Sequence, residues 1–365
     1  MKKIVVVGQT PPPFGGQAVM IEHLVKGVYK EMKVYHVRMH FSQDLSDRGK
    51  CSFYKIIQLF KVIFEIWRIR ICYGVKIIYY PPSSSPRVAV LRDAIILGCT
   101  RWIFKDVIFH FHAAGISEEL PKYNVVLRKI VYQILKKPRL SITSSQFNPD
   151  DATYLDAYEK IIIPLGIPDA NPHELRKNKN KEGLTLLFMG LLNETKGEGY
   201  VLEAVRILKE RGFDIEFNIA GRFENDEYCE SFMRKIRQYE LENVVHYCGV
   251  VTGKKKQDLF LSSDIMCFPS YFSSESFGIV LLEAMMYQMP IIASRWRGVQ
   301  SVVDEGCNGY LVDVKNVEQI VVAVEKFYNN RSLIDCMGKE GRRVYCERYE
   351  LSKYLMALEN AVNNL

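Results

Sequence analysis

The chain has 365 residues, of which 48% are apolar and 25% are charged, and its net charge is +7. This composition excludes a disordered chain, and the length is sufficient for two domains of ordinary size. No apolar run approaches the roughly 20 residues that a membrane-spanning helix needs.

The positive charge lies in the first half of the chain. Residues 1–168 contain 24 Lys and Arg and 13 Asp and Glu, a net of +11, and the remainder has a net charge of −4. This imbalance predicts an anionic partner, which is a membrane surface, a lipid-linked diphosphate or a nucleic acid. No RNA- or DNA-binding motif accompanies the charge, so we expect no nucleic-acid partner.

The nine cysteines form no C-x-x-C pair and no regular framework. Such usage predicts free thiols in the core and a reducing compartment, with neither disulfides nor zinc. The apolar run 4–7 near the start is too short for the core of a signal peptide and is typical of a first strand. We therefore expect a cytoplasmic protein. Peripheral attachment to the inner face of the cell membrane is compatible with this expectation.

Short β-rich runs alternate with helical stretches from end to end. The predicted strands are 4–7, 34–37, 76–80, 107–112, 140–143 and 160–164 in the first half, and 184–189, 215–220, 244–247, 265–268 and 290–293 in the second. Continuous apolar strands between helices are typical of parallel sheets that are covered on both faces. The sequence therefore predicts an α/β protein with two doubly wound, Rossmann-like domains.

The boundary between the two series is rich in turn and charged residues. Prolines at 164, 168 and 172 precede the basic run 176–181, which cannot bury itself. We predict a first domain at 1–168, a linker at 169–182, a second domain at 183–345 and a C-terminal helix at 346–365 that packs back towards the first domain. Ligands of open parallel sheets lie outside the carboxyl ends of the strands, so the predicted site lies in the cleft between the domains.

The first loop, at residues 8–18, joins the first strand to a helix that we expect to begin near Gln17. Gly15 and Gly16 allow the backbone to approach a ligand closely, and three prolines stiffen the turn. The loop is neither a G-x-G-x-x-G nor a Walker loop, which excludes dinucleotide and NTP binding of those types. A plain strand-to-helix turn is the alternative.

The segment 51–73 predicts a helix with two apolar faces. One stripe consists of Phe53, Ile56, Ile57, Phe60, Phe64, Trp67 and Ile71, flanked by Lys61 and Arg68, and Val62, Ile66 and Ile69 lie on the far side. One face is expected to pack on the sheet, and the other to rest on a bilayer with its cations towards anionic headgroups. A helix buried on both sides is the alternative.

Two histidines lie at the end of the fourth predicted strand. Alternation places His110 and His112 on one face, but no third metal ligand is apparent, so we predict no metal site. A histidine at a strand's carboxyl end is well placed to bind a substrate hydroxyl, which favours His112 as a site residue and His110 as a structural one.

Cations follow two strands of the second series. Lys196 lies in the loop after 184–189, where it can neutralise a diphosphate as a point charge. Arg222 follows Gly221 at the end of the next strand, and a helix cap on the surface is its alternative role. We expect backbone groups at Gly249 and Val250 to contact the base of a nucleotide.

The segment 271–285 is the most informative part of the chain. A strand and Pro269 precede it, and helix formers without a breaker follow Gly278. Backbone amides at a helix start, with the helix dipole, form an anion site, to which Ser276, Phe277 and Ile279 belong here. Glu275 on the adjoining loop fits an acceptor for sugar hydroxyls, and Glu283 lies within the helix. An ordinary acidic first turn is the alternative.

The spacing of Glu275 and Glu283 resembles the E-x7-E motif of the retaining glycosyltransferases of family 4. The sequence segments 276–278, 290–294 and 304–312 match the pattern of this family as well, and the resemblance covers nearly the whole chain. It implies the GT-B architecture, with two Rossmann-like domains that face each other across a cleft.

The resemblance also implies roles for individual residues. Gly15 and Gly16 match a P-x-x-G-G loop over the donor's sugar and diphosphate, His112 matches a histidine near the donor sugar, and Glu283 matches the carboxylate that binds both ribose hydroxyls. Two positions depart from the pattern: Leu191 replaces an arginine, and Ser301 replaces a glutamate. Arg222 is our candidate for the missing cation.

The sequence thus predicts a retaining glycosyltransferase that moves a sugar from a nucleotide-diphosphate sugar to an acceptor hydroxyl. Glu275, His112 and Lys196 are the predicted catalytic residues, and no metal or other cofactor is expected because the chain has no Asp-x-Asp. The resemblance suggests a lipid-linked or oligosaccharide acceptor in cell-surface polysaccharide synthesis. A nucleotide-sugar epimerase and a non-catalytic nucleotide-sugar-binding partner are the alternatives.

Overall fold

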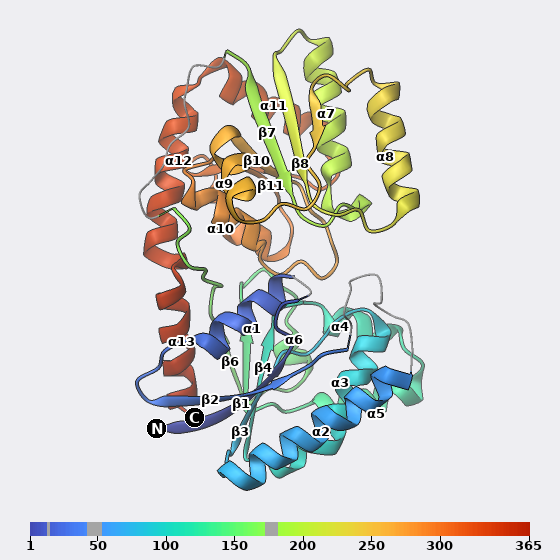
Figure 1. Ribbon diagram of the computed structural model, residues 1–365, viewed down its shortest axis with the longest axis vertical. Coiled ribbons are helices and arrows are strands. Elements are labelled where there is room, and N and C mark those ends of the chain that lie inside the picture. Colours follow the sequence, from blue (N-terminus) through green and yellow to red (C-terminus); the bar gives the residue numbers. More distant parts are fainter. Residues whose placement is uncertain (13–14, 42–52, 172–181) are drawn as a thin grey trace. The chain divides into compact units, whose positions relative to one another are not determined.

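The computed structural model describes residues 1–12, 15–41, 53–171 and 182–365 (Figure 1). The chain divides into two compact units. Unit 1 consists of residues 1–167 and 351–365, and unit 2 of residues 168–350. The basic run 176–181, which is part of the linker predicted at 169–182, lies outside the described residues.

Unit 1 is built on a six-stranded parallel sheet in the order β2-β1-β3-β4-β5-β6. β3 and β4 are buried along their whole lengths, as expected for strands covered on both faces. The strands are β1 Lys2–Gly8, β2 Met32–Arg38, β3 Ile77–Tyr80, β4 Asp106–Phe111, β5 Leu140–Thr143 and β6 Glu159–Ile162. The helices are α1 Gly16–Lys26, α2 Phe53–Tyr73, α3 Arg87–Thr100, η2 Arg101–Ile103, α4 Ile116–Glu119, η3 Leu120–Lys122, α5 Val125–Leu135, α6 Asp151–Tyr154 and α13 Leu351–Asn363.

Unit 2 has a second six-stranded parallel sheet, in the order β12-β11-β10-β7-β8-β9. Its strands are β7 Leu184–Met189, β8 Ile215–Ala220, β9 Val245–Tyr247, β10 Ile265–Phe268, β11 Ile291–Ser294 and β12 Gly309–Val312. Its helices are η4 Glu194–Lys196, α7 Glu198–Glu210, α8 Asp226–Gln238, α9 Gly253–Ser262, α10 Ile279–Met286, η5 Arg297–Ser301, α11 Val317–Asn329, α12 Ser332–Val344 and the π-helical turn η6 Tyr345–Tyr349. The predicted α/β fold with two parallel sheets is confirmed.

The helix α2 has the two apolar faces that its sequence predicts. Val62, Ile66 and Ile69 are buried, and α2 packs against β1, β2 and α3. Phe60 and Phe64 on the other face are 66% and 70% exposed. The alternative of a helix buried on both sides is therefore wrong for the described side chains, among which that of Phe53 is not included.

The C-terminal helix α13 belongs to unit 1. Its entry is fixed by the Leu351 amide, which donates to the carbonyl of Ile167 at 3.0 Å. At its far end, the Lys2 ammonium donates to the carbonyls of Val362 and Asn363 at 3.1 and 2.9 Å. Tyr354, in the middle, is buried. These contacts tie the last helix to the first strand.

The cysteines differ from their prediction. All eight described cysteines are free, but Cys267 alone among them is buried, so the prediction of core thiols is wrong for the other seven. In the described parts of the chain, no helix combines the length and the apolar character that crossing a bilayer requires.

Candidate active site

The loop between β7 and α7 positions Lys196. The Asn193 side chain accepts a hydrogen bond from the Lys196 amide at 3.0 Å and so closes the turn η4. Gly197 follows with φ +92°, a left-handed conformation that favours glycine, and a Cβ there would overlap the Pro269 carbonyl. The loop after β7 therefore lies directly against the loop after β10, which carries Glu275.

Lys196 and Glu275 form an ion pair. The Lys196 Nζ lies 2.5 Å from the Glu275 Oε2, and their side chains are only 15% and 11% exposed. The Ser270 hydroxyl donates to the same carboxylate oxygen at 3.1 Å. The ammonium also lies 4.7 Å from the centre of the Phe272 ring, within the range of a cation–π interaction. Two predicted catalytic residues thus meet at one point, 79 positions apart in the sequence.

The start of α10 adjoins this pair. Gly278 adopts φ +84° immediately before the helix, which places the preceding chain across the helix's N-terminal end. Ser276 and Phe277 are buried, and the Phe277 ring packs edge-on against Tyr349 at 5.7 Å. Glu275 lies on the loop and Glu283 within α10, as predicted. The segment 276–279 therefore combines a rigid backbone with the positive end of a helix dipole.

Glu283 has a partner that the sequence did not identify. The Lys256 Nζ lies 2.5 Å from the Glu283 Oε1, and both side chains are partly exposed, at 32% and 21%. Lys256 is the last of three consecutive lysines at the start of α9. The three lysines were the only sequence signal for this ion pair, but only the packing of α9 near α10 reveals which of them contacts Glu283.

Arg222 lies beside the segment where an arginine is missing. The Leu192 amide donates to the Arg222 carbonyl at 2.9 Å, so the chain at Leu191 runs alongside Arg222. The Gly221 amide donates to the Gly249 carbonyl at 2.8 Å, which brings the next strand end to the same edge. Val250, which follows, is 70% exposed. The predicted cation and the predicted base-contacting backbone are therefore neighbours.

A buried carboxyl lies in the turn after Lys196. Glu198, the first residue of α7, is fully buried next to Tyr228, and burial raises the pKa of this carboxyl to about 8. Its side chain thus carries a proton at neutral pH. Sequence reasoning missed this group, because a glutamate at a helix start normally signals an exposed first turn.

The histidine pair belongs to unit 1. His110 lies in β4 and His112 directly follows it, and their rings stack at 4.1 Å. The Tyr79 hydroxyl of the neighbouring strand β3 lies 2.6 Å from His110 Nδ1 and 3.3 Å from His112 Nε2. Burial lowers the pKa of His112 to about 3 and that of His110 well below its usual range. Both rings are therefore neutral at physiological pH.

The predicted glycine loop is also in unit 1. The helix α1 begins at Gly16 instead of Gln17, and Gly15 before it has φ −169°, an extended backbone open to any residue. Arg38 donates to the carbonyls of Thr10, Pro11 and Pro12 at 3.0–3.2 Å, which fixes the first part of the loop. Residues 13 and 14 lie outside the described chain.

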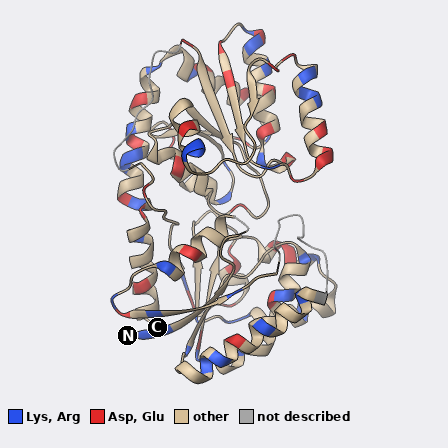
Figure 2. Ribbon diagram, viewed as in Figure 1, with Lys and Arg blue, Asp and Glu red and all other residues tan. Residues whose placement is uncertain are grey.

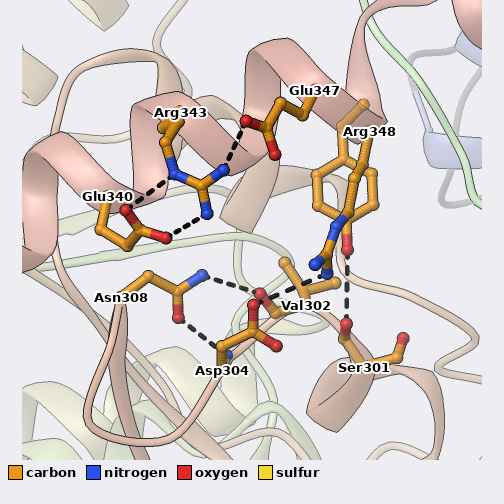
Figure 3. A network of polar contacts seen from close by, with 9 residues as sticks. Ser301, Val302, Asp304, Asn308, Glu340, Arg343, Glu347 and Arg348 are labelled. Carbon is orange, nitrogen blue, oxygen red and sulfur yellow. Dashed lines mark hydrogen bonds and ion pairs between the residues drawn. The ribbon is translucent and has the colours of Figure 1, made fainter.

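The segment after β11 has a structural role. The Ser301 hydroxyl, at the position of the expected glutamate, donates to the Gly298 carbonyl at 2.6 Å. Asp304 forms an ion pair with Arg348 at 3.6 Å, and the Asn308 side chain is hydrogen-bonded to the Asp304 amide and the Val302 carbonyl (Figure 3). Arg343 forms ion pairs with Glu340 and Glu347 beside them. Arg348 thus joins η6 to the loop, and Arg343 joins α12 to η6.

Among the described residues there is no group of three or more His, Cys, Asp and Glu side chains that could hold a metal ion. The predicted site residues fall into two sets. Gly15, Gly16 and His112 belong to unit 1, and Lys196, Arg222, Val250, Glu275, Glu283 and the segment 276–279 belong to unit 2.

Comparison with known proteins identifies the second half of the chain. Residues 171–344 match the family model of the group 1 glycosyl transferases. A phosphatidyl-myo-inositol mannosyltransferase of Mycolicibacterium smegmatis is 33% identical over 245 residues, 66% of this chain and 56% of that protein. An uncharacterised 41.2 kDa protein from the cps region of Klebsiella pneumoniae is 29% identical over 50% of this chain and 46% of its own length. The chain spans about half the length of the curated relatives it matches.

The fold is shared with solved structures over the full chain. HepE of Anabaena, solved in complex with UDP-glucose, aligns with a TM-score of 0.74 at 15% identity and covers 100% of both chains. At this identity the likeness shows the fold alone.

Proposed function

We propose that the chain is a retaining glycosyltransferase that uses a nucleotide-diphosphate sugar, because residues 171–344 match the family model of the group 1 glycosyl transferases. The observation that carries the proposal is the ion pair of Lys196 with Glu275 next to the start of α10. A largely buried cation, a carboxylate and a helix N-terminus at one strand edge provide the groups that a sugar diphosphate needs.

In the proposed reaction, Lys196 leaves Glu275 to bind the donor's diphosphate. The amides of 276–279 bind the same anion, and positive charge there stabilises the diphosphate as it departs. Glu275, released from the lysine, accepts hydrogen bonds from the sugar hydroxyls. Glu283 binds the ribose, and Lys256 holds one of the two carboxylate oxygens of Glu283 in place. We propose that no metal or other cofactor is required, because these groups supply the positive charge.

Retention is proposed to follow from attack on the face that the diphosphate leaves. The bond between the anomeric carbon and the diphosphate oxygen breaks, and the acceptor oxygen bonds to that carbon from the same side. The acceptor's proton passes to the departing diphosphate oxygen. His112 is neutral, as its pKa of about 3 requires, so it contributes a hydrogen bond to the sugar without adding charge.

The proposed acceptor is an oligosaccharide or a lipid-linked sugar of a cell-surface polysaccharide. Two relatives support this class: one by its printed name is a phosphatidyl-myo-inositol mannosyltransferase, and the other comes from a cps region. The excess of Lys and Arg in residues 1–168 fits an anionic acceptor or the surface of the membrane that holds it.

The test begins with the donor. Thermal unfolding is measured with UDP, GDP, ADP and CMP, each at about 100 times a plausible dissociation constant, where binding adds about 2.7 kcal/mol. UDP is the first choice, because HepE was solved with UDP-glucose. A stabilising shift with one nucleotide identifies the base, and the absence of any shift contradicts the proposal.

Glu275→Ala then separates transfer from binding. We expect turnover to fall by about a hundredfold or more while the nucleotide-induced shift persists. Glu227→Ala, an exposed glutamate on α8, is the matched control. Leu191, which replaces the arginine of the family pattern, favours one second candidate, a non-catalytic nucleotide-sugar-binding partner. A nucleotide shift without any transfer by the parent protein, tested with nucleotide sugars and an acceptor mixture, would favour that candidate.

A further inference from the structure

Unit 1 exposes a continuous apolar surface, which we call the α2 face. It consists of Ile57, Phe60, Phe64, Trp67 and Ile71 on α2, together with Trp102. Phe64, Ile71 and Trp102 are 70%, 73% and 68% exposed. Large exposed apolar patches on a folded protein mark an interaction site more often than chance.

The α2 face is not needed to hold the helix in place. Val62, Ile66 and Ile69 anchor α2 from the opposite side, and all three are at most 4% exposed. In addition, the Arg70 guanidinium donates to the carbonyl of Ile103 at 2.7 Å. The strongly exposed side chains of Phe60, Phe64 and Ile71 are therefore not needed for the packing of unit 1.

Two tryptophans fix the rim of the face. The rings of Trp67 and Trp102 meet edge-on at 5.7 Å, and both indole nitrogens donate to the Cys99 carbonyl at 3.0 Å. The pair is thus held rigidly while the Trp102 ring remains open to solvent. Tryptophan is favoured where an apolar layer meets a polar one, because its ring combines both characters.

A basic cavity adjoins Trp102. Its volume is about 430 Å³, and its lining includes Arg101, Trp102, Lys105, Lys137 and Arg139 but no Asp or Glu among the described residues. Lys105 and Arg139 have acidic neighbours outside the lining, Asp106 at 3.7 Å and Glu159 at 2.7 Å. Arg101 instead donates to the carbonyls of Ile134 and Lys137, and burial lowers its pKa.

Charge identifies the occupant of the α2 face. Figure 2 shows Lys and Arg along α2. Lys61 and Arg68 flank the α2 face, and Arg68 pairs with Glu65. Further positive charge comes from the cations that line the adjoining cavity. A second copy of this chain would bring the same cations against each other. An anionic bilayer instead offers an apolar layer for the aromatic rings and phosphates for the cations.

We propose that the α2 face is a membrane-docking surface, which inserts its aromatic side chains into an anionic bilayer while the cavity next to Trp102 takes lipid headgroup phosphates. The proposal concerns the site of action of the enzyme proposed above, but it does not depend on glycosyl transfer, because docking is measured without donor or acceptor.

The test is flotation of the full chain with phosphatidylcholine vesicles, with and without about 30% phosphatidylglycerol. We expect binding to the anionic vesicles that is at least tenfold stronger and that weakens as salt is raised. The double variant Phe60→Gln with Phe64→Gln should lose at least tenfold in binding. Val28→Gln with Met356→Gln, which removes two exposed apolar side chains elsewhere in unit 1, should bind like the parent.

A second pair of variants tests the cavity. Lys105→Gln with Lys137→Gln should weaken binding to anionic vesicles by at least threefold more than Lys209→Gln with Lys235→Gln, which removes the same charge from exposed positions of unit 2. If both pairs of variants lose the same amount of vesicle binding, the cavity contributes only nonspecific positive charge, and the proposal that it takes headgroup phosphates is overturned.

Two results would overturn the docking surface itself. One is parent protein that stays unbound at low salt. The other is a dimer in light scattering that Phe60→Gln with Phe64→Gln converts to monomer, in the absence of vesicle binding. Nucleotide-induced stabilisation measured on every variant distinguishes these failures from failure of the donor site, and it also verifies that each variant is folded.

Discussion

The two units share a six-stranded parallel sheet, but the polar groups at their strand ends differ in charge. Unit 2 holds the ion pair of Lys196 with Glu275 there, and a second pair, Lys256 with Glu283, joins the helices α9 and α10. Unit 1 holds two stacked histidines that burial keeps neutral. The two cations of unit 2 each face a carboxylate, whereas the two imidazoles of unit 1 are buried without one and lose their protons.

Under the proposed function, this difference corresponds to a division of work between the units. A paired cation can exchange its carboxylate for a diphosphate at little cost in desolvation, because the ion pair is already removed from water. A neutral imidazole suits a sugar hydroxyl, to which it can donate or from which it can accept a hydrogen bond. Substitutions that remove charge in unit 2 should therefore have larger effects than those that remove hydrogen bonds in unit 1.

The largest effect is expected for Lys196→Met. The variant removes the cation that we assign to the departing diphosphate and leaves Glu275 largely buried without its partner. Turnover should fall about 10²- to 10³-fold, measured as kcat with saturating donor. Lys209→Met, at an exposed position on α7, serves as the control. Turnover within threefold of the parent would remove Lys196 from the mechanism.

The second effect concerns pH and stability. Glu198 keeps its proton in the folded protein up to a pH of about 8, whereas the unfolded chain releases it near 4.5. Between these values the folded state binds more protons, so the free energy of unfolding falls as pH rises, by up to about 1.4 kcal/mol per pH unit. Glu198→Gln should remove this slope in urea titrations at pH 5, 6 and 7.5. A variant that retains the parent's pH dependence would show that Glu198 is ionised in the fold.

The third effect tests whether Arg222 replaces the cation that is missing at Leu191. Arg222→Ala should weaken nucleotide diphosphate binding about tenfold if Arg222 replaces the arginine that Leu191 lacks, since a charged hydrogen bond contributes about 1.5–3 kcal/mol. Arg237→Ala on the exposed side of α8 is the matched control. The measurement is calorimetric titration with the nucleotide identified by thermal shift. Equal affinity of parent and variant would restrict Arg222 to a structural role.

The regular elements were predictable because each is a local pattern. β5, β7, β8 and β10 have the predicted bounds, because each is a short apolar run between clear breakers. The added strand β12 was missed, because its four residues begin with Gly309 and lie only partly buried. Local periodicity also predicted the two faces of α2, one of which is buried and the other exposed.

The site was predictable only in part, for a physical reason. Glu275 and Lys196 were each identified by their place at a strand end, but no local pattern indicates that they pair, since 79 positions separate them. Lys256 and Tyr79 were missed for the same reason: each acts on a residue of another element. Cysteine burial was mispredicted because composition reports the redox state expected of thiols but not their location.

The smallest effect is expected in unit 1, from removal of the hydroxyl that contacts both histidines. Tyr79→Phe keeps the ring and removes the oxygen at 2.6 Å from His110 and 3.3 Å from His112. The free energy of unfolding should fall by about 1 kcal/mol, the usual contribution of a hydrogen bond. If Tyr79 is a positioning residue for His112, kcat/KM should also fall about threefold, because the imidazole can then rotate away from the donor sugar.

The neighbouring tyrosine separates positioning from stability. Tyr80 is also fully buried, but it lies on the opposite face of β3, and its hydroxyl donates to Asp93 at 2.8 Å. Tyr80→Phe should therefore destabilise the fold by a similar amount without changing kcat/KM. An equal loss of kcat/KM in both variants would mean that activity follows stability alone, and a loss confined to Tyr79→Phe would identify the histidine pair of unit 1 as part of the reaction site.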